Sequence, residues 1–173
     1  MELRQASIED AAPLAVVHVE TWQAAYGALL PADFLASLDV AARARAWHER
    51  LLVSGTALRT VVGERDGEIV GFATTGASRD EDADAGTGEL ITLSCHPRAW
   101  GTGVGRALIA DGVEHLTAAG YHEATLWVLE GNGRAQRFYR AAGWRPDRTI
   151  KTAQIGGEQL RELRYRRGLC PVR

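Results

Sequence analysis

Apolar residues along the chain recur at two different spacings, and the order in which these spacings alternate restricts the fold. Some segments show the alternation or the short apolar run of a β-strand, and others show the three-to-four-residue spacing of an amphipathic helix. Strands are predicted over 2–6, 60–64, 68–73, 89–95 and 123–129 and on either side of 156–157, and helices over 8–26, 33–52, 105–119 and 133–142. The order β-α-α-β-β-β-α-β-α-β-β predicts an α/β (α+β) fold with helices packed on a mixed, seven-stranded sheet.

Residues with strong turn and capping preferences mark the ends of these elements. Asp66-Gly67 and Gly156-Gly157 are typical of two-residue β-hairpin turns. Ser7 followed by Asp10 resembles a capping box, and Asn132 and Gly143 suit the start and the end of a helix. The second helical segment is predicted to be interrupted near residues 38–39. In the first helix the predicted inward face comprises Ala12, Ala15, Val16, Val19, Gln23 and Tyr26.

Length and composition favour a single soluble domain. The chain has 173 residues, of which 46% are apolar, and no apolar run approaches the roughly 20 residues of a membrane span. Its two cysteines, Cys95 and Cys170, provide neither a disulfide framework nor the ligand spacing of a metal site. We therefore expect one domain over residues 1–173, located in the cytoplasm, with no bound metal and no membrane partner.

Charge is distributed unevenly along the chain. Residues 1–133 carry 9 basic and 19 acidic side chains, whereas residues 134–173 carry 11 basic and 3 acidic ones. Such a basic segment raises the hypothesis of nucleic-acid binding. However, Arg134, Arg137 and Arg140 recur every three residues, as on a solvated helix face, and Arg164 and Arg166 alternate with apolar residues, as on the outer face of a strand. We therefore expect solvated faces and no nucleic-acid partner. The acidic loop over residues 80–84 is expected to be solvated, with attraction of a cationic amine as the alternative.

A glycine-rich turn joins the strand at 89–95 to the following helix. Gly101, Gly103 and Gly105 remove side chains where a helix begins, so that backbone N–H groups can converge on an anion such as a diphosphate. The turn is not a P-loop, because Arg106 and Ala107 stand where that motif needs Lys and Ser or Thr. Nor does its G-x-G-x-G spacing match a dinucleotide-binding fingerprint. A plain strand-to-helix connection is the alternative.

A second motif distinguishes between these interpretations. Residues 132–144, NGRAQRFYRAAGW, closely resemble the pattern N-x-R-A-x-x-F-Y-x-x-x-G-[FW]. Together with the strand, glycine turn and helix that precede it, this segment resembles the GNAT N-acetyltransferase superfamily. The resemblance covers residues 89–146. It implies acetyl-CoA as co-substrate and a sheet whose two central strands splay apart around it.

Carried over position by position, the resemblance implies a set of residues that bind coenzyme A. Leu93, Ser94 and Cys95 match the strand positions whose backbone pairs with the pantetheine arm, and Asn132 matches the residue that hydrogen-bonds it. The pyrophosphate turn falls on Trp100, Gly101, Thr102, Gly103, Val104 and Gly105, followed by Arg106. Trp100 departs from the usual Gln or Arg, and Thr102 replaces a frequent basic residue. Binding through backbone N–H groups does not depend on those side chains.

Two residues are candidates for catalysis. Tyr139 matches the family tyrosine that protonates the leaving thiolate, although Ala135, Phe138, Tyr139 and Ala142 also share one helix face, as core residues would. Glu89 matches the general base of the histone-acetylating branch, and a half-buried carboxylate with a raised pKa suits that role. A solvated glutamate and a water acting as base are the alternatives.

The acceptor side of the site is less defined by sequence. The resemblance places the first two helices beside the acceptor, where Trp22, Tyr26 and Phe34 are candidate lining residues or, alternatively, core. We expect an amine acceptor, with a small molecule such as a polyamine, an amino acid or an aminoglycoside-like compound favoured over a protein N-terminus or lysine. A non-catalytic acyl-CoA-binding regulator is a further hypothesis. A homodimer stays open.

Overall fold

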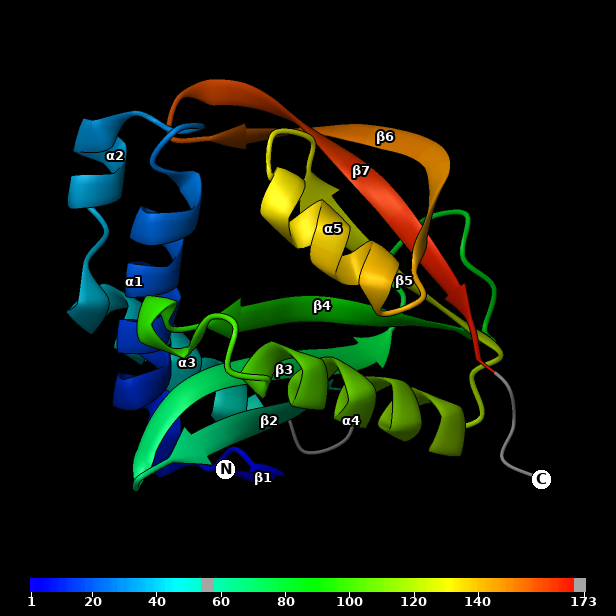
Figure 1. Ribbon diagram of the computed structural model, residues 1–173, viewed down its shortest axis with the longest axis horizontal. Helices are drawn as coiled ribbons and strands as arrows, with labels where there is room; N and C mark the ends of the chain where they lie inside the picture. The colour runs from blue at the N-terminus through cyan, green and yellow to red at the C-terminus, as the bar shows by residue number, and fades with distance from the viewer. Residues whose placement is uncertain (54–57, 170–173) are drawn as a thin grey trace.

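The computed structural model describes residues 1–53 and 58–169, and Cys170 lies outside them. The described residues form one seven-stranded sheet in the order β1-β2-β3-β4-β5-β7-β6 (Figure 1). The strands are β1 (Glu2–Gln5), β2 (Leu58–Arg65), β3 (Glu68–Ala77), β4 (Thr87–Cys95), β5 (Glu123–Leu129), β6 (Arg145–Ile155) and β7 (Glu158–Gly168). The α-helices are α1 (Ala11–Tyr26), α2 (Ala32–Ala36), α3 (Val40–Val53), α4 (Val104–Ala118) and α5 (Gly133–Ala141), with 3-10 turns at Ile8–Asp10 and Pro97–Ala99. The predicted fold class is confirmed.

The two central strands of the sheet separate soon after they begin. β4 and β5 are the parallel pair, and they pair only at Thr87–Glu123, Gly88–Ala124 and Glu89–Thr125. From there β4 follows β3 and β5 follows β7, both antiparallel, so the strands diverge toward their C-terminal ends (Figure 1). The splay implied by the family resemblance is present.

Helices cover both faces of the sheet, because the strands are apolar on both sides. Val62 and Phe72 pack with Leu14 and Trp47 from α1 and α3 on one face. The neighbouring residue Val61 points to the other face, where a larger core joins α4 and α5 to β5 and β7. The two-residue period of the strands thus places successive side chains in different cores.

Local turn and cap chemistry matches the sequence predictions. Asp66 and Gly67 have φ of 55° and 78°, and Gly156 and Gly157 have 60° and 84°, the left-handed pairs that tight hairpins require. The Ser7 N–H donates to Asp10 Oδ2 at 2.7 Å. The predicted interruption near residues 38–39 separates α2 from α3.

The predicted inward face of α1 is partly wrong. Ala12, Val16 and Gln23 are exposed, whereas the buried residues are Ala11, Leu14, Ala15, Val17, Val19 and Thr21. The reason is that α1 lies against both the sheet and α3, which buries a wide arc of the helix instead of one narrow stripe (Figure 1).

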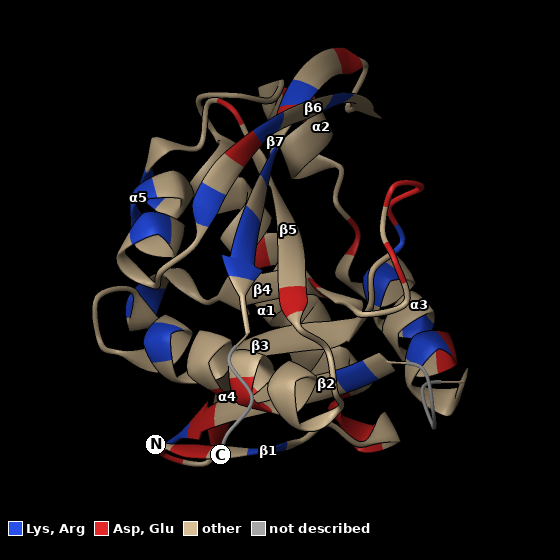
Figure 2. Ribbon diagram, turned by 90° about the vertical axis from the view of Figure 1, so that its right-hand side faces the viewer, with Lys and Arg blue, Asp and Glu red and all other residues tan. Residues whose placement is uncertain are grey.

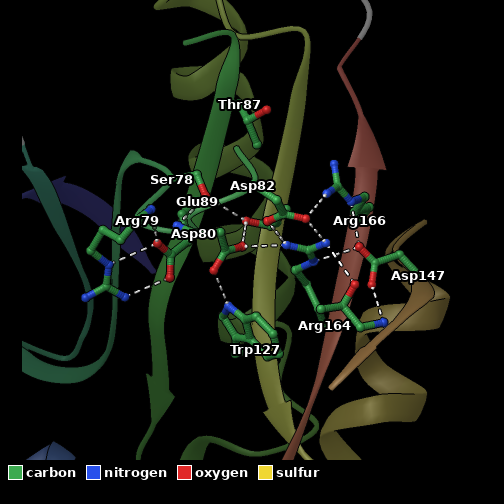
Figure 3. A network of polar contacts seen from close by, with 12 residues as sticks. Ser78, Arg79, Asp80, Asp82, Thr87, Glu89, Trp127, Asp147, Arg164 and Arg166 are labelled. Atoms are coloured by element: carbon green, nitrogen blue, oxygen red, sulfur yellow. Dashed lines mark hydrogen bonds and ion pairs between the residues drawn. The ribbon is translucent and has the colours of Figure 1, made fainter. Parts of the chain in front are cut away.

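The prediction of solvated arginines on β7 is also wrong for Arg164. Its side chain is only 4% exposed and lies between Asp80 and Asp82 of the β3–β4 loop and Asp147 of β6 (Figure 3). Arg164 donates to Asp82 Oδ1 at 2.5 Å and to Asp147 Oδ2 at 2.7 Å. Buried charges persist in proteins when they are paired in this way. The acidic loop is therefore attached to β7 through two of its aspartates.

The basic residues on α5 are exposed, as predicted for a solvated helix face. Arg134, Arg137 and Arg140 are exposed, and Figure 2 shows basic positions on α5 and along the β6–β7 hairpin. The basic C-terminal quarter of the chain is thus part of the folded sheet and helix, and its arginines differ sharply in environment.

Candidate active site

A cavity of about 380 Å³ is lined by the diverging end of β4, the glycine turn and α5. Its lining residues are Leu93, Cys95, Ala99, Trp100, Gly101, Gly103, Gly105, Arg106, Arg134, Ala135, Phe138, Tyr139, Ala141 and Ala142. The cavity therefore combines an apolar wall from α5 and β4 with a backbone-rich turn.

The turn owes its shape to glycine. Gly101 and Gly103 have φ of 76° and 94°, a region that other residues enter at a cost, and Gly103 is the N-cap of α4. At Gly105 a Cβ atom would lie 3.4 Å from both the Cys95 Sγ and the Phe138 ring, so glycine lets α4 approach α5. The first turn of α4 contains no acidic residue. Its free N–H groups and the helix dipole make this end of α4 favourable for an anion.

Trp100 is held rigidly beside this turn. Its Nε1 donates to the Cys95 carbonyl oxygen at 2.7 Å, and Thr21 Oγ1 of α1 donates to the same oxygen at 3.0 Å. Burial raises the pKa of the Cys95 thiol to about 11, so the group is a neutral thiol at physiological pH. This agrees with an interpretation of Cys95 as a strand residue and not as a nucleophile.

Tyr139 lies at the buried end of the α5 wall. It is 9% exposed, and its ring contacts Phe138 and Tyr165 with centroids 5.4 and 6.4 Å away. Burial raises the pKa of Tyr139 well above the usual value, and the nearby Tyr26 and Cys95 add to the effect. The phenol is therefore fully protonated at neutral pH, which is the state needed in a proton donor.

The acceptor-side candidates Trp22, Tyr26 and Phe34 do not line the cavity, and of the three only Tyr26 is near enough to Tyr139 to affect its pKa. The Trp22 and Tyr26 rings contact edge to face at 5.0 Å, and a hydrogen bond from Asn132 counteracts the burial that raises the Tyr26 pKa. The Phe34 ring covers Gly156 at the tip of the β6–β7 hairpin, where a Cβ atom would lie 2.6 Å from it. The end of α1 and α2 thus close one side of the splay against the C-terminal hairpin.

Glu89 has a different environment from the predicted half-buried one. It is 2% exposed, and its two oxygens accept from Arg79 Nη2 at 2.7 Å and Nε at 3.0 Å (Figure 3). The Arg79 backbone N–H also donates to Glu89, at 3.1 Å. The two side chains meet because Arg79 is near the start of the β3–β4 loop, next to the N-terminal end of β4. Glu89 does not line the cavity.

Comparison with known proteins identifies the family. The profile described as "Acetyltransferase (GNAT) family" matches residues 20–144, from α1 to the end of α5. This chain belongs to the GNAT acetyltransferase family. It is 33% identical over 162 residues to the uncharacterized N-acetyltransferase YuaI of Bacillus subtilis, which covers 93% of this chain and 89% of that protein.

Two further proteins are similar to this chain, one in part of its sequence and the other in its fold. The mycothiol acetyltransferase of Thermobispora bispora is 38% identical over 84 residues, which cover 48% of this chain and 28% of that longer protein. The crystal structure of the PaiA N-acetyltransferase of Thermoplasma acidophilum with coenzyme A has a TM-score of 0.74 at 19% identity. The superposition covers 96% of this chain and 98% of the PaiA chain, and at this identity it shows a similarity of fold alone.

Most of the GNAT residues predicted from sequence come together around the cavity. Leu93, Cys95, Trp100, Gly101, Gly103, Gly105, Arg106 and Tyr139 line it. Four others lie beside it: Ser94 and Val104 are buried, Thr102 donates to the Ala99 carbonyl at 2.8 Å, and Asn132 accepts from the Ala135 N–H at 3.1 Å as the cap of α5.

Sequence reasoning missed part of the lining of this GNAT site. Ala135, Phe138 and Ala142 share the helix face of Tyr139, and that periodicity signals their position although it does not separate a cavity wall from a core. Arg134 was assigned to the opposite, solvated face, yet it lines the cavity as well. Ala99 carried no signal in the sequence.

The described residues contain neither a metal-binding cluster nor a membrane-spanning helix. Within 1–53 and 58–169 no group of three His, Cys, Asp or Glu side chains is arranged to hold a metal ion. No helix in these ranges is both long and apolar enough to cross a membrane.

Proposed function

We propose that this GNAT protein is an acetyl-CoA-dependent N-acetyltransferase that transfers acetyl directly to a primary amine. The observation that carries the proposal is one cavity, lined by the diverging end of β4, the glycine turn and α5, that joins this turn to a buried, protonated tyrosine. The coenzyme A complex of a neighbour with the same fold supports the choice of co-substrate. We also propose that the enzyme acts in the cytoplasm, where acetyl-CoA is available.

The chain's own groups divide the binding of acetyl-CoA between them. The backbone N–H groups of the turn and of the start of α4 bind the diphosphate, except those of Trp100 and Thr102, which donate to the Pro97 and Ala99 carbonyls, and Arg106 lines the cavity beside them. β4 has no paired neighbour on its β5 side after Glu89, and its Leu93–Cys95 segment runs along the pantetheine arm. Asn132 completes this side. The apolar face of α5 excludes water from the thioester.

Transfer needs one bond formed, one bond broken and two protons moved. The amine nitrogen forms a bond to the thioester carbonyl carbon, and the carbon–sulfur bond then breaks. Tyr139 donates its proton to the departing thiolate, and the proton lost by the amine ultimately replaces it. The products are an N-acetyl amine and the free thiol of coenzyme A.

We further propose that water accepts the proton of the amine. Glu89 is the other candidate, but both its oxygens already accept hydrogen bonds from Arg79. A base must reach the proton that it removes, directly or through one water. The Glu89–Arg79 pair leaves a water molecule as the simpler acceptor.

The proposed acceptor is a small amine. Phe34 packs on Gly156, and Leu29 packs on Gly131 where a Cβ atom would come within 2.3 Å. These contacts join the α1–α2 segment to the C-terminal hairpin and to the turn before α5, and such closure suits a compact acceptor better than an extended peptide. A protein N-terminus or lysine is the second candidate, because acetyl transfer to either uses the same chemistry.

A thiol-release assay tests the proposal. Coenzyme A production from acetyl-CoA is followed across polyamines, amino acids, aminoglycosides and peptides with a free N-terminus or lysine. We expect amine-dependent release that is highest with a small amine. Release with peptides alone would favour the protein acceptor. Binding of acetyl-CoA with no release across the whole panel would favour the non-catalytic regulator. Light scattering with and without acetyl-CoA distinguishes a monomer from a homodimer.

A further inference from the structure

Arg134 and Trp100 are stacked on one another in the lining of the cavity. The Arg134 Cζ lies 3.2 Å from the centroid of the Trp100 ring, and both residues line the cavity. Trp100 comes from the turn after β4 and Arg134 from the second position of α5, so the contact bridges the two walls that diverge at the splay.

The tryptophan provides a fixed platform. Its indole N–H is already used in the 2.7 Å hydrogen bond to the Cys95 carbonyl, which restricts rotation of the ring. A guanidinium that stacks on an aromatic face uses its own face for the contact. The N–H donors along its edge therefore stay available for a planar or tetrahedral anion.

No carboxylate neutralises Arg134 among residues 1–53 and 58–169. Its contact is the Trp100 ring, whereas Arg164 on the opposite face of the sheet contacts three aspartates. The first turn of α5 also lacks acidic residues, and a cation there opposes the helix dipole. Partial burial lowers the pKa of Arg134, which reflects the same unfavourable position for an uncompensated charge. An anion bound in the cavity would compensate it.

We propose that Arg134, held on the face of Trp100, binds the diphosphate of coenzyme A from the α5 side, opposite the backbone N–H groups of the glycine turn. This inference rests on the proposed function. It gives a role to Trp100, because the aromatic ring holds a cation that comes from α5. Arg134 is then a binding residue and Trp100 its positioning residue.

Equilibrium binding to three ligands tests the assignment. Coenzyme A and dephospho-coenzyme A both contain the diphosphate, and pantetheine lacks it; each is titrated by calorimetry, with displacement for the weakest. We expect Arg134→Ala to weaken both diphosphate ligands about tenfold and to leave pantetheine unchanged, as for one charge-assisted contact at a solvent-accessible site. Arg137→Ala is the matched control, because Arg137 is exposed on the same helix but does not line the cavity. It should bind all three ligands like the wild type.

A double-mutant cycle tests the platform. Trp100→Leu should weaken coenzyme A binding about fivefold, and Trp100→Leu combined with Arg134→Ala should be no weaker than Arg134→Ala alone, because the ring acts through the guanidinium. Arg134→Lys keeps the charge without the planar stack, and we expect a loss of about threefold.

Each contrary result has a distinct meaning. Equal losses for pantetheine and coenzyme A would overturn the diphosphate assignment in favour of a general effect on the cavity. A loss seen with coenzyme A but not with dephospho-coenzyme A would move Arg134 to the 3′-phosphate and also overturn it. A wild-type protein that binds none of the three ligands would overturn the proposed function, and the inference with it.

Discussion

The β4–β5 seam is the line along which these two strands first pair and then diverge. Arginines at its two ends have opposite environments. Beside the paired end, Arg164 is buried among Asp80, Asp82 and Asp147, and Arg166, opposite Thr125, shares Asp147 with it at 2.6 Å (Figure 3). At the splayed end, Arg134 lines an open cavity and has an aromatic ring but no carboxylate within the described residues. The chain's basic C-terminal quarter contributes to both ends.

This contrast separates structural charges from charges available to a ligand. A buried guanidinium is tolerated only when carboxylates and hydrogen bonds replace its hydration. A guanidinium at a solvent-accessible cavity keeps its water until an anion displaces it. The count of arginines therefore says little about function here, whereas the presence or absence of internal partners separates the two groups.

Substitution of Arg164 should give the largest change in stability. Arg164→Ala leaves three carboxylates facing one another, and we expect the free energy of unfolding to fall by about 3–5 kcal/mol. Arg134→Ala should change it by less than about 0.5 kcal/mol, because no partner is left unpaired. Urea unfolding measures both. Equal losses in the two variants would contradict the distinction between the two ends.

Acid titration sharpens the same comparison. Hydrogen bonds from Arg164 lower the pKa of Asp82, and although burial raises the pKa of Asp147, hydrogen bonds from Thr149, Arg166 and Arg164 more than compensate and lower it overall. A carboxyl whose pKa is lower in the folded state stabilises the protein above its unfolded pKa of about 3.9, and this contribution is lost as the pH falls below it. The wild type should therefore lose stability below about pH 4 more steeply than Arg164→Ala does.

Tyr139→Phe tests the chemistry at the splayed end. The substitution removes the proton donor and keeps the ring in its packing, so we expect kcat to fall about 100-fold with little change in KM for acetyl-CoA or in stability. Because burial raises the Tyr139 pKa above its usual value, wild-type kcat should not decline on the alkaline side up to about pH 10. Full turnover in Tyr139→Phe would remove Tyr139 from the role of acid.

The contrast between local chemistry and contacts that are distant along the chain explains what could be predicted from sequence. The hairpins at 66–67 and 156–157 and the Asn132 cap depend on chemistry within a few residues, and the structure has them. Arg164 meets Asp82 across 82 positions of the chain, and alternation along β7 cannot reveal a partner so far away. A strand pattern predicts which face a side chain points to, but not whether an acidic loop covers that face. The same limit hid the stacking of Arg134 on Trp100.

Gly103→Glu tests the anion site in the glycine turn. Both Gly103→Ala and Gly103→Glu are strained at a φ of 94°, but only glutamate adds a negative charge at the start of α4. We expect coenzyme A affinity to fall about threefold for alanine and about 30-fold for glutamate, since like charges repel where the dipole favours an anion. Titration calorimetry on both variants separates strain from charge, and similar losses would show that charge at the turn is irrelevant.

Glu89 lies at the paired end of the seam, and Glu89→Gln should have the smallest effect on activity. The amide keeps the shape of the side chain but weakens its two hydrogen bonds with the Arg79 guanidinium, and the Arg79 side chain is 62% exposed and can be hydrated. We expect a loss of about 1–2 kcal/mol in the free energy of unfolding, as for a charge-assisted hydrogen bond, and a kcat within about threefold of wild type. Arg79→Gln, which breaks the pair from the other side, is the matched control. A 100-fold fall in kcat for Glu89→Gln alone would make Glu89 the base, and the paired end of the seam would then belong to the catalytic machinery.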